Sequence, residues 1–306
     1  MRTIKLGKSS LNVPVIAVGC MRLNSIDKNK AEAFIKTAID NGANFFDHAD
    51  IYGKGECEKI FSECIHMNSD IREKIIIQSK CGIVPGKMYD FSKEHILSSV
   101  DGILSRLKTD YLDVLLLHRP DALVEPEEVG EAFELLKETG KVRYFGVSNH
   151  NPMQIQLLMK SLNMSIEVNQ LQLSIANSTM ISNGINVNMM NDAAVCRDGS
   201  VLDFCRLNNI TIQTWSPFQY GFFNGTFVDN DEFGELNKKL SEIANKYNAS
   251  KTTIVMAWLL RHSASFQPVT GTMNTERLLD CIKAAEIKIT REEWYDIFKS
   301  CKNKLP

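Results

Sequence analysis

The sequence lacks a long hydrophobic run and any large excess of charge. Among its 306 residues no apolar stretch approaches the roughly 20 needed to span a bilayer, and Met1–Lys5 lacks the apolar character of a secretory signal. The formal net charge of −2 and the pI near 6.3 are unlike those of nucleic-acid-binding proteins. We therefore expect a cytoplasmic protein whose partner is neither a membrane nor a nucleic acid.

Three kinds of motif are also missing. The eight cysteines are scattered and none forms a Cys-x-x-Cys pair, which is typical of reduced structural thiols rather than of a disulfide framework. No His-Glu-x-x-His or comparable cluster is present, so no metal site is expected. The absence of Gly-x-Gly-x-x-Gly argues against a doubly wound open sheet that binds a dinucleotide.

What the chain does have is a repeated alternation of short apolar runs with amphipathic stretches. A hairpin over Thr3–Leu6 and Val13–Val15 opens the chain. Eight further runs are strand candidates, several of them almost continuously apolar, as in a parallel sheet buried on both faces: Ile16–Cys20, Asn44–Asp47, Ile75–Lys80, Leu112–His118, Tyr144–Ser148, Ile166–Leu171, Ile210–Trp215 and Phe266–Gly271. Eight strand–helix repeats predict an α/β fold of the (β/α)8 TIM-barrel type, with the doubly wound sheet as the runner-up.

Helices with a period near 3.6 residues are predicted between these runs. Pro126 marks the first turn of one helix and Gly140 its end, while Thr290 and Glu293 form a capping box that opens an extra C-terminal helix. Ser174–Gly199 is interpreted as a long loop or a short irregular insertion. Gln219–Gly234 is interpreted as a loop. Because there is no linker or low-complexity tract, residues 1–306 are expected to form a single barrel domain.

Polar side chains end most of the predicted strands. In a TIM barrel the carboxyl ends of the strands meet at one mouth, and the active site lies there. The side chains concerned are Asp47, Tyr52, Lys80, His118, Ser148, Asn149, Asn169, Gln170, Trp215 and Ser216. We therefore expect these residues to converge on one site.

Several of these residues lie in motifs that resemble the aldo-keto reductase family. The stretch Phe46–Gly53, with the sequence Phe-Asp-His-Ala-Asp-Ile-Tyr-Gly, and Glu56 and Glu58 beyond it are similar to the family signature. The resemblance continues in chain order through Ser79-Lys80, Leu117-His118, Gly146–Asn149, Asn169-Gln170, Trp215–Pro217 and Gly271–Leu278. The stretch Thr290–Trp294 resembles a bacterial-type branch of oxidoreductases. The resemblance implies a TIM barrel that uses a nicotinamide cofactor.

The resemblance implies that Asp47, Tyr52, Lys80 and His118 are catalytic. A carbonyl that receives hydride needs a proton, but a tyrosine with an ordinary pKa of about 10 is a weak acid at neutral pH. We expect the Lys80 ammonium to lower the pKa of Tyr52, and Asp47 to supply the counter-charge that a buried lysine needs. His118 is expected to hydrogen-bond and orient the carbonyl oxygen. Each residue alone also fits an ordinary structural role, whereas the four in this order favour catalysis.

The resemblance also implies where the nicotinamide end of the cofactor binds. Ser148, Asn149 and Gln170 match the residues that anchor the carboxamide. Trp215 matches the aromatic residue that stacks on the ring, where the family often has tyrosine. The remaining matches are residues along the pyrophosphate and backbone contacts to the cofactor: Ser216, Pro217, Phe218, Gly19, Cys20 and Met21, with Asp47 beside them. His48 and Asp50, which flank the signature, are expected to make structural hydrogen bonds.

The 2′-phosphate of NADP(H) is expected to bind just ahead of a predicted helix. The matching stretch contains Gly271, Thr272, Asn274 and Arg277. The first-turn amides of a helix and a planar guanidinium suit a phosphate. Many relatives have lysine where Gly271 stands, so a preference for NADPH weaker than theirs is expected. Alternatively, Arg277 is only a solvated charge in the first turn.

Together these residues predict an NADP-dependent aldo-keto reductase that reduces a small aldehyde or ketone, with Tyr52 as the general acid. One alternative keeps the fold but binds the cofactor as a regulatory subunit without significant turnover. Another is a non-redox barrel, an isomerase or aldolase, in which Lys80 forms a Schiff base. The oligomeric state and the physiological substrate do not follow from the sequence.

Overall fold

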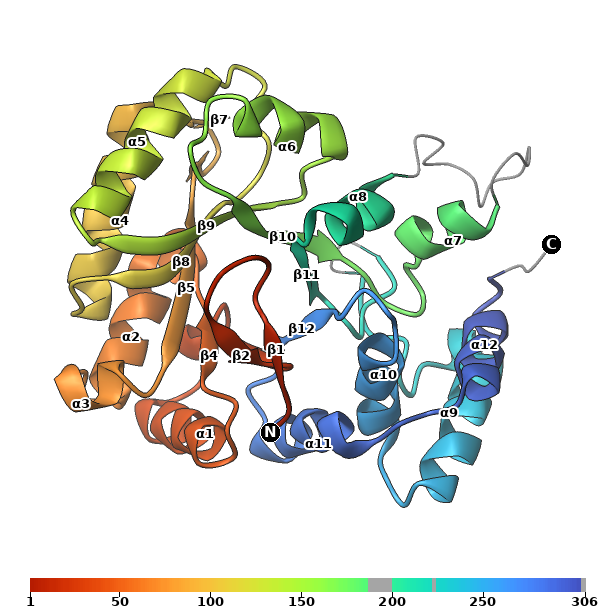
Figure 1. The fold of residues 1–306 in the computed structure, drawn as a ribbon. Coiled ribbons are helices and arrows are strands. Elements are labelled where there is room, and N and C mark those ends of the chain that lie inside the picture. Colours follow the sequence, from red (N-terminus) through yellow and green to blue (C-terminus); the bar gives the residue numbers. More distant parts are fainter. Residues whose placement is uncertain (187–199, 222–223, 304–306) are drawn as a thin grey trace.

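The computed structural model describes residues 1–186, 200–221 and 224–303. The described residues form a closed barrel of parallel strands with helices around it (Figure 1). In order around the barrel the strands are β3 (Ala17–Gly19), β4 (Phe45–Asp47), β5 (Ile76–Cys81), β8 (Leu112–Leu117), β9 (Val142–Ser148), β10 (Ile166–Gln172), β11 (Thr211–Trp215) and β12 (Gln267–Thr270), which pairs with β3. The predicted (β/α)8 barrel is confirmed, and its strands differ from the predicted runs only at their ends.

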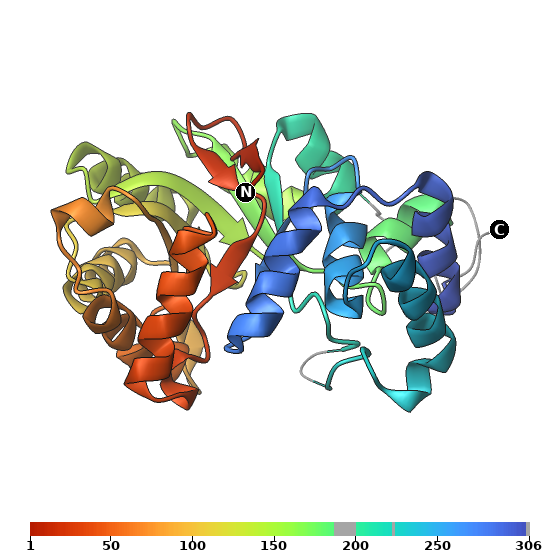
Figure 2. The same ribbon diagram turned by 90° about the horizontal axis from the view of Figure 1, so that it is seen from below.

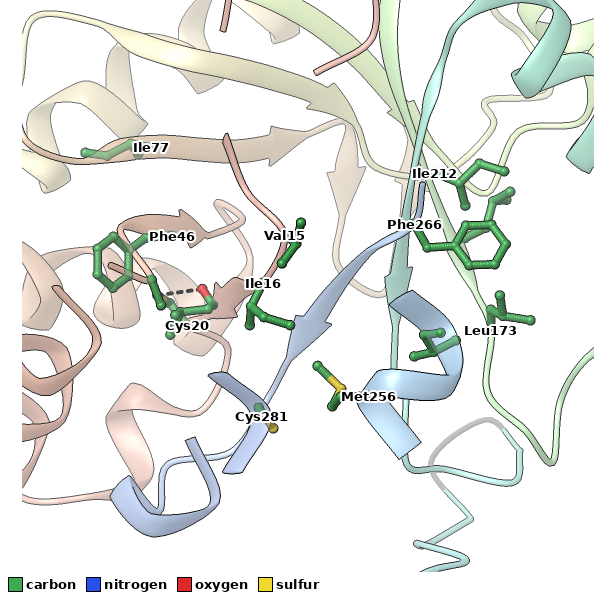
Figure 3. Packing of buried hydrophobic residues seen from close by; sticks show 14 of the residues in the cluster. Val15, Ile16, Cys20, Phe46, Ile77, Leu173, Ile212, Met256, Phe266 and Cys281 are labelled. Atoms are coloured by element: carbon green, nitrogen blue, oxygen red, sulfur yellow. Dashed lines mark hydrogen bonds between the residues drawn. The ribbon is translucent and has the colours of Figure 1, made fainter. Parts of the chain in front are cut away.

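Side chains on alternate faces of the strands build two buried clusters. Phe46 of β4, Ile77 of β5 and Ile212 of β11 point outward and share one cluster with helix residues such as Met256 and Cys281 (Figure 3). The inward set, which includes Phe45 and Val114, forms the second cluster inside the barrel. The helices that cover the outside are α1 (Lys28–Asp40), α2 (Glu56–Cys64), α3 (Ser69–Arg72), α4 (Lys93–Leu107), α5 (Pro126–Glu138), α6 (Pro152–Met159), α7 (Thr179–Ile185), α8 (Val201–Asn208), α9 (Gly234–Lys246), α10 (Lys251–Leu260), α11 (Thr275–Lys283) and α12 (Arg291–Ser300).

The predicted hairpin is present and fills one end of the barrel. It consists of β1 (Thr3–Lys5) and β2 (Asn12–Pro14), which pair antiparallel (Figures 1 and 2). Leu6 and Val13 pack against the interior cluster, and the turn amides bond to Glu167 near the start of β10 and to Thr211 at the start of β11. The hairpin therefore closes the amino-terminal end of the barrel and leaves the carboxyl ends of the strands for a site.

The structure confirms the predicted helix ends, corrects one loop prediction and adds a hairpin that was not predicted. Pro126 begins α5, and Thr290 with Glu293 forms the capping box of α12. The predicted loop Ser174–Gly199 contains α7, which forms because Met180 and Ile181 are buried against the barrel; residues 187–199 lie outside the described part. A second hairpin was missed, formed by β6 (Ile83–Val84) and β7 (Met88–Tyr89) after β5. In the described part of the chain, no helix is long and apolar enough to cross a membrane.

Candidate active site

The four residues predicted to be catalytic come from neighbouring strand ends. Asp47 is the last residue of β4, Lys80 lies near the end of β5, and His118 directly follows β8. Tyr52 begins a 3-10 helix, η2 (Tyr52–Gly55), in the loop after β4. Because β4, β5 and β8 are adjacent in the barrel, the four side chains lie at one point of its carboxyl end, as predicted.

Lys80 is the centre of this group. Its side chain is completely buried, and Nζ lies 2.7 Å from the His48 carbonyl oxygen, 2.8 and 2.9 Å from the two carboxylate oxygens of Asp47, and 3.1 Å from Tyr52 Oη. Burial disfavours the ammonium, but attraction to Asp47 and Tyr52 outweighs it and raises the pKa of Lys80 above its ordinary value. Lys80 is therefore a fixed positive charge.

The pKa of Tyr52 differs from the sequence-based expectation. Burial raises it above its ordinary value, and the nearby Lys80 charge offsets only part of that rise. Lys80 lowers the pKa of Tyr52 as expected, but burial raises that pKa by more, and the sequence does not show how completely a phenol is buried. Tyr52 is consequently a protonated phenol at neutral pH, with an ammonium in contact with its oxygen.

His118 completes the group as a neutral imidazole. Its pKa lies well below the ordinary value because the ring is buried, and the Lys80 and Arg119 charges lower it further. The rings of His118 and Tyr52 meet edge to face, with centroids 6.1 Å apart. Nδ1 of His118 is buried and makes no hydrogen bond to any described residue. Such a ring can donate a hydrogen bond to a substrate oxygen without adding charge.

The residues predicted to bind the carboxamide and the nicotinamide ring are linked by hydrogen bonds. Trp215 Nε1 donates to Asn149 Oδ1 at 3.2 Å, Asn149 Nδ2 donates to Ser148 Oγ at 2.7 Å, and Ser148 Oγ donates to the Gln170 carbonyl oxygen at 3.1 Å. Trp215 is half-buried, so one part of its indole remains accessible. Asn149 has a left-handed φ of 60°, an uncommon conformation for a residue other than glycine. The hydrogen bond to Asn149 fixes the plane of the Trp215 ring.

Gln170 is engaged more deeply than predicted. Its side chain points into the barrel, where Nε2 donates to Asp47 Oδ1 at 3.1 Å and to Gln213 Oε1 at 3.0 Å. Within the described residues its Oε1 has no hydrogen-bond donor, so only this oxygen is open to a carboxamide. Gln170 therefore connects the predicted carboxamide site to the catalytic carboxylate.

The other predicted cofactor contacts lie at the ends of β3 and β11. Gly19 ends β3, and a Cβ there would lie 3.0 Å from the Thr270 carbonyl oxygen of β12. Cys20 and Met21 follow directly, and the Cys20 amide donates to the Asp47 carbonyl oxygen at 2.9 Å. Ser216, Pro217 and Phe218 follow β11, and Ser216 has a left-handed φ of 52°. Both segments therefore flank the catalytic group.

A comparison with known proteins agrees with this geometry. The model of the Aldo/keto reductase family matches residues 15–301. The chain belongs to this family. Membership in the family makes the protein an oxidoreductase of the carbonyl-reducing type in general.

Curated relatives are similar over most of their length. The chain is 36% identical to the uncharacterized oxidoreductase YcsN of Bacillus subtilis over 97% of each chain, and 33% identical to oxidoreductase YdhF of Escherichia coli over 88% of this chain and 86% of YdhF. It is 31% identical to a 6-dehydroglucose reductase of Agrobacterium fabrum, covering 87% of this chain and 86% of that one. A solved structure of the thermostable aldo-keto reductase Tm1743 with the inhibitor epalrestat is 24% identical and superimposes with a TM-score of 0.78 over 98% of this chain and 100% of that one. At this identity the solved structure supports the fold alone.

The predicted phosphate site of this aldo-keto reductase is built differently from expectation. Asn274 is the N-cap of α11, and its Oδ1 accepts a hydrogen bond from the amide of Arg277 at 2.9 Å. The amide of Asn274 in turn donates to Thr272 Oγ1 at 3.1 Å. The Arg277 side chain is exposed, and so is Glu276 in the same turn. One of the first-turn amides expected to face an anion, that of Arg277, is thus used by the cap, and Glu276 adds a negative charge beside it. Gly271, the first residue of the stretch, is exposed.

His48 and Asp50 differ in how far they make the expected hydrogen bonds. Both ring nitrogens of His48 and Oδ1 of Asp50 are buried and have no partner among the described residues, whereas the backbone amide of Ile51 donates a hydrogen bond to the Asp50 carboxylate. Burial lowers the pKa of His48 to about 3, while burial and the Glu58 carboxylate raise the pKa of Asp50 to about 7. His48 packs its ring edge on Phe61, with centroids 4.6 Å apart. The expectation was wrong for the His48 ring, which is placed by packing rather than by hydrogen bonds.

Sequence reasoning missed two features of the site. Glu58 appeared only as part of the signature, but it is fully buried and bonds Arg106 Nε at 2.7 Å and Ser79 Oγ at 2.8 Å. Arg119 lies with its guanidinium carbon 5.8 Å from the centroid of the Trp215 ring. Because Arg119 directly follows His118 in the sequence, it could have been predicted at the carboxyl end of the barrel.

Proposed function

We propose that the protein reduces an aldehyde or ketone to an alcohol by hydride transfer from NADPH, with Tyr52 as the general acid. The observation that carries this proposal is the position of Lys80 Nζ, 2.8 Å from Asp47 Oδ1 and 3.1 Å from Tyr52 Oη. A protonated phenol can give its proton to a carbonyl oxygen as negative charge develops there. Lys80 then stabilises the phenolate that remains, and Asp47 holds Lys80 in place.

The residues around this group fit a nicotinamide cofactor. When bound, NADPH supplies the hydride. Trp215 offers a flat face whose plane is fixed by Asn149, and the free Oε1 of Gln170 can accept from the carboxamide. The proposed contacts along the rest of the cofactor are those predicted from the sequence: Gly19, Cys20, Met21, Ser148, Ser216, Pro217, Phe218, Gly271, Thr272, Asn274 and Arg277. The preference for NADPH over NADH rests on Arg277 alone, because Gly271 has no charge.

His118 orients the substrate in this proposal. A neutral imidazole can donate a hydrogen bond to the carbonyl oxygen, which polarises the carbonyl and directs its oxygen to the Tyr52 hydroxyl. The depressed pKa of His118, caused first by burial, keeps the ring neutral at physiological pH. His118 is therefore a hydrogen-bond donor, and the proton comes from Tyr52.

The two alternatives are less well supported. A Schiff base needs a neutral, nucleophilic amine, whereas the pKa of Lys80 is raised and Nζ has oxygen partners on three residues. A regulatory subunit without turnover would not need an intact proton donor with its charge partners. We also propose a cytoplasmic location, because the described cysteines are free thiols.

A cofactor-consumption screen tests this function. Loss of NADPH absorbance is followed with a panel of small aldehydes, ketones and sugars. With the best substrate, Tyr52→Phe should lower kcat by about 10²–10⁴-fold, the usual contribution of general acid catalysis, and leave the Kd for NADPH nearly unchanged. Retention of most of the turnover in Tyr52→Phe would refute the assignment of the proton donor. Tight NADPH binding without turnover across the panel would favour the regulatory subunit.

A further inference from the structure

A layer of buried amides lies between the catalytic carboxylate and the N-terminal hairpin. Gln78, Gln170, Gln213 and Gln267 come from β5, β10, β11 and β12, and none of them is more than 3% exposed. Branched apolar side chains usually fill a TIM barrel, and a buried amide costs free energy unless it is hydrogen-bonded. Packing alone therefore does not account for four glutamines in this position.

In the half of the layer nearer the hairpin, the orientation of each side-chain amide is fixed by its hydrogen bonds. Gln267 Nε2 donates to the Pro14 carbonyl oxygen at 2.8 Å, and Gln213 Nε2 donates to Gln267 Oε1 at 2.8 Å. A backbone carbonyl can only accept, so Gln267 must turn its NH₂ group to Pro14 and its oxygen to Gln213. Gln213 must then turn its NH₂ group to Gln267 and its own oxygen the other way.

In the half nearer the catalytic group, the side-chain amides are oriented in the same sense, with their NH₂ groups as donors. Gln213 Oε1 accepts from Gln78 Nε2 at 2.6 Å and from Gln170 Nε2 at 3.0 Å. The same two nitrogens also donate to Asp47 Oδ1, at 2.7 Å from Gln78 and 3.1 Å from Gln170. Each NH₂ group therefore uses one hydrogen on Gln213 and the other on Asp47. The orientation set at Pro14 delivers two N–H donors to the catalytic carboxylate.

We propose that Gln213 is a positioning residue, which holds Gln78 and Gln170 with their NH₂ groups toward Asp47 and so fixes the carboxylate that binds Lys80. The reaction-related part of this proposal rests on the proposed function. Without the oxygen of Gln213, one hydrogen of each NH₂ group would be buried without a partner. Both amides would then rotate, because an unsatisfied buried donor is unfavourable.

Loss of these donors changes the charge balance at Tyr52. Two N–H groups partly offset the negative charge of Asp47, and their removal leaves a more negative carboxylate beside Lys80 and Tyr52, which disfavours the phenolate. The side chain of Gln213 bonds only to Gln78, Gln170 and Gln267 among the described residues. It therefore makes no hydrogen bond to the other titratable and charged groups that act on Tyr52 or Lys80, which are Cys20, His48, Asp50, Glu58, His118 and Arg119. The pKa of Tyr52, measured by titration, therefore reports whether the buried glutamines still donate to Asp47.

The test is a tyrosinate absorbance titration of the purified full chain. The signal of Tyr52 is the part that disappears in Tyr52→Phe, so the measurement needs no turnover. Gln213→Met, which keeps the side-chain volume, should raise the midpoint of Tyr52 by about half a pH unit. Gln267→Met breaks the layer one residue further from Asp47 and should produce a smaller shift in the same direction. If a substrate is found, kcat should fall in Gln213→Met and KM should change little.

Thr214→Val is the matched control. Thr214 is the next residue on β11, is buried, and its hydroxyl has no partner among the described residues. An unmoved midpoint in folded Gln213→Met, or an equal shift in Thr214→Val, would overturn the proposal. If Gln213→Met does not fold, the same criterion applies to Gln267→Met. Absence of wild-type turnover would refute the proposed function, while the titration would still decide the role of Gln213.

Discussion

Lys80 shows at the scale of one residue how reactivity depends on burial. Its ammonium is completely removed from solvent, and the Asp47 carboxylate beside it is almost as buried. Such pairs rarely add stability, and removing one partner typically costs about 3–5 kcal/mol because the other charge remains buried. The proton transfer proposed for Tyr52 therefore explains the pair better than the stability of the barrel does.

In the proposed function, the preference for NADPH rests on Arg277. Arg277→Ala should raise the Kd for NADPH by roughly tenfold to a hundredfold, which corresponds to about 1.5–3 kcal/mol for a charge-assisted contact. The Kd for NADH should change little, because NADH has no 2′-phosphate. Titration of both cofactors against both proteins measures this difference.

Glu276 provides the matched control for that experiment. It is exposed in the same first turn, so Glu276→Gln removes a negative charge without disturbing the Asn274 cap. NADPH binding should become tighter in this variant, and NADH binding should not change. Equal losses for the two cofactors in Arg277→Ala, or a wild-type preference for NADH, would exclude a phosphate site here.

At the scale of elements, polar contacts join segments that are distant in sequence. The ring centroids of Trp258 of α10 and Trp294 of α12 lie 4.8 Å apart in a stacked pair, and each indole N–H donates to the other residue's carbonyl oxygen, at 3.1 and 3.0 Å.

The N-terminal hairpin is held in a similar way, by Glu167 of β10. Gly7 has a φ of 54°, and a Cβ there would lie 2.4 Å from Glu167 Oε2. Only glycine lets the turn approach the carboxylate this closely.

The hairpin contact predicts a specific loss of stability. Glu167 Oε2 accepts the amides of Lys8 at 2.5 Å and Ser9 at 3.0 Å, so Glu167→Gln should lower the free energy of unfolding by about 1.5–3 kcal/mol, the range for hydrogen bonds to a charged group. Urea unfolding measures this change. The control is Glu242→Gln, which removes an exposed ion pair with Lys239 on α9 and should have little effect. Similar stability losses in the two variants would show that the hairpin is not held by Glu167.

At the scale of the whole molecule, buried histidines make the fold sensitive to acid. Burial lowers the pKa of His48 to about 3 and of His150 and His262 to about 4, and the pKa of His118 also lies well below its ordinary value. The unfolded chain binds these protons more readily, so stability is full above about pH 6.5 and is lost as the pH falls toward 4. Asp50 and Glu58 act in the opposite direction, because burial raises the pKa of both carboxyl groups, that of Asp50 to about 7, but they are two groups against four.

His48→Phe tests this acid sensitivity. His48 has no hydrogen bond through its ring among the described residues and packs on Phe61, so a phenyl ring fits its surroundings. Between pH 7 and pH 5 this variant should lose about 2 kcal/mol less stability than the wild type, as urea unfolding at the two pH values would measure. His66→Asn, at an exposed position, should follow the wild type. An unchanged pH slope in His48→Phe would contradict the linkage.

The barrel and the chemical groups at its carboxyl end could be predicted from the amino-acid sequence alone. The period of the apolar residues depends on local backbone geometry, so the runs that became β8 and β10 could be located from neighbours in the chain. Asp47, Tyr52, Lys80 and His118 lie at the ends of the runs that became β4, β5 and β8 or follow them, and the carboxyl ends of parallel strands necessarily meet. The turn chemistry of the capping box at Thr290 is equally local.

How these groups act on one another depends on the closed barrel and could not be predicted from the sequence. The rise in the pKa of Tyr52 comes from burial, and burial depends on residues from the whole circumference of the barrel. Gln78 and Gln213 are 135 residues apart in sequence, and a glutamine within an apolar strand was their only signal. Met180 and Ile181 form a helix where a loop was expected, because the barrel surface buries them. A pattern along the chain specifies which face a side chain takes, but its distance from a partner on another strand is set only when the barrel closes.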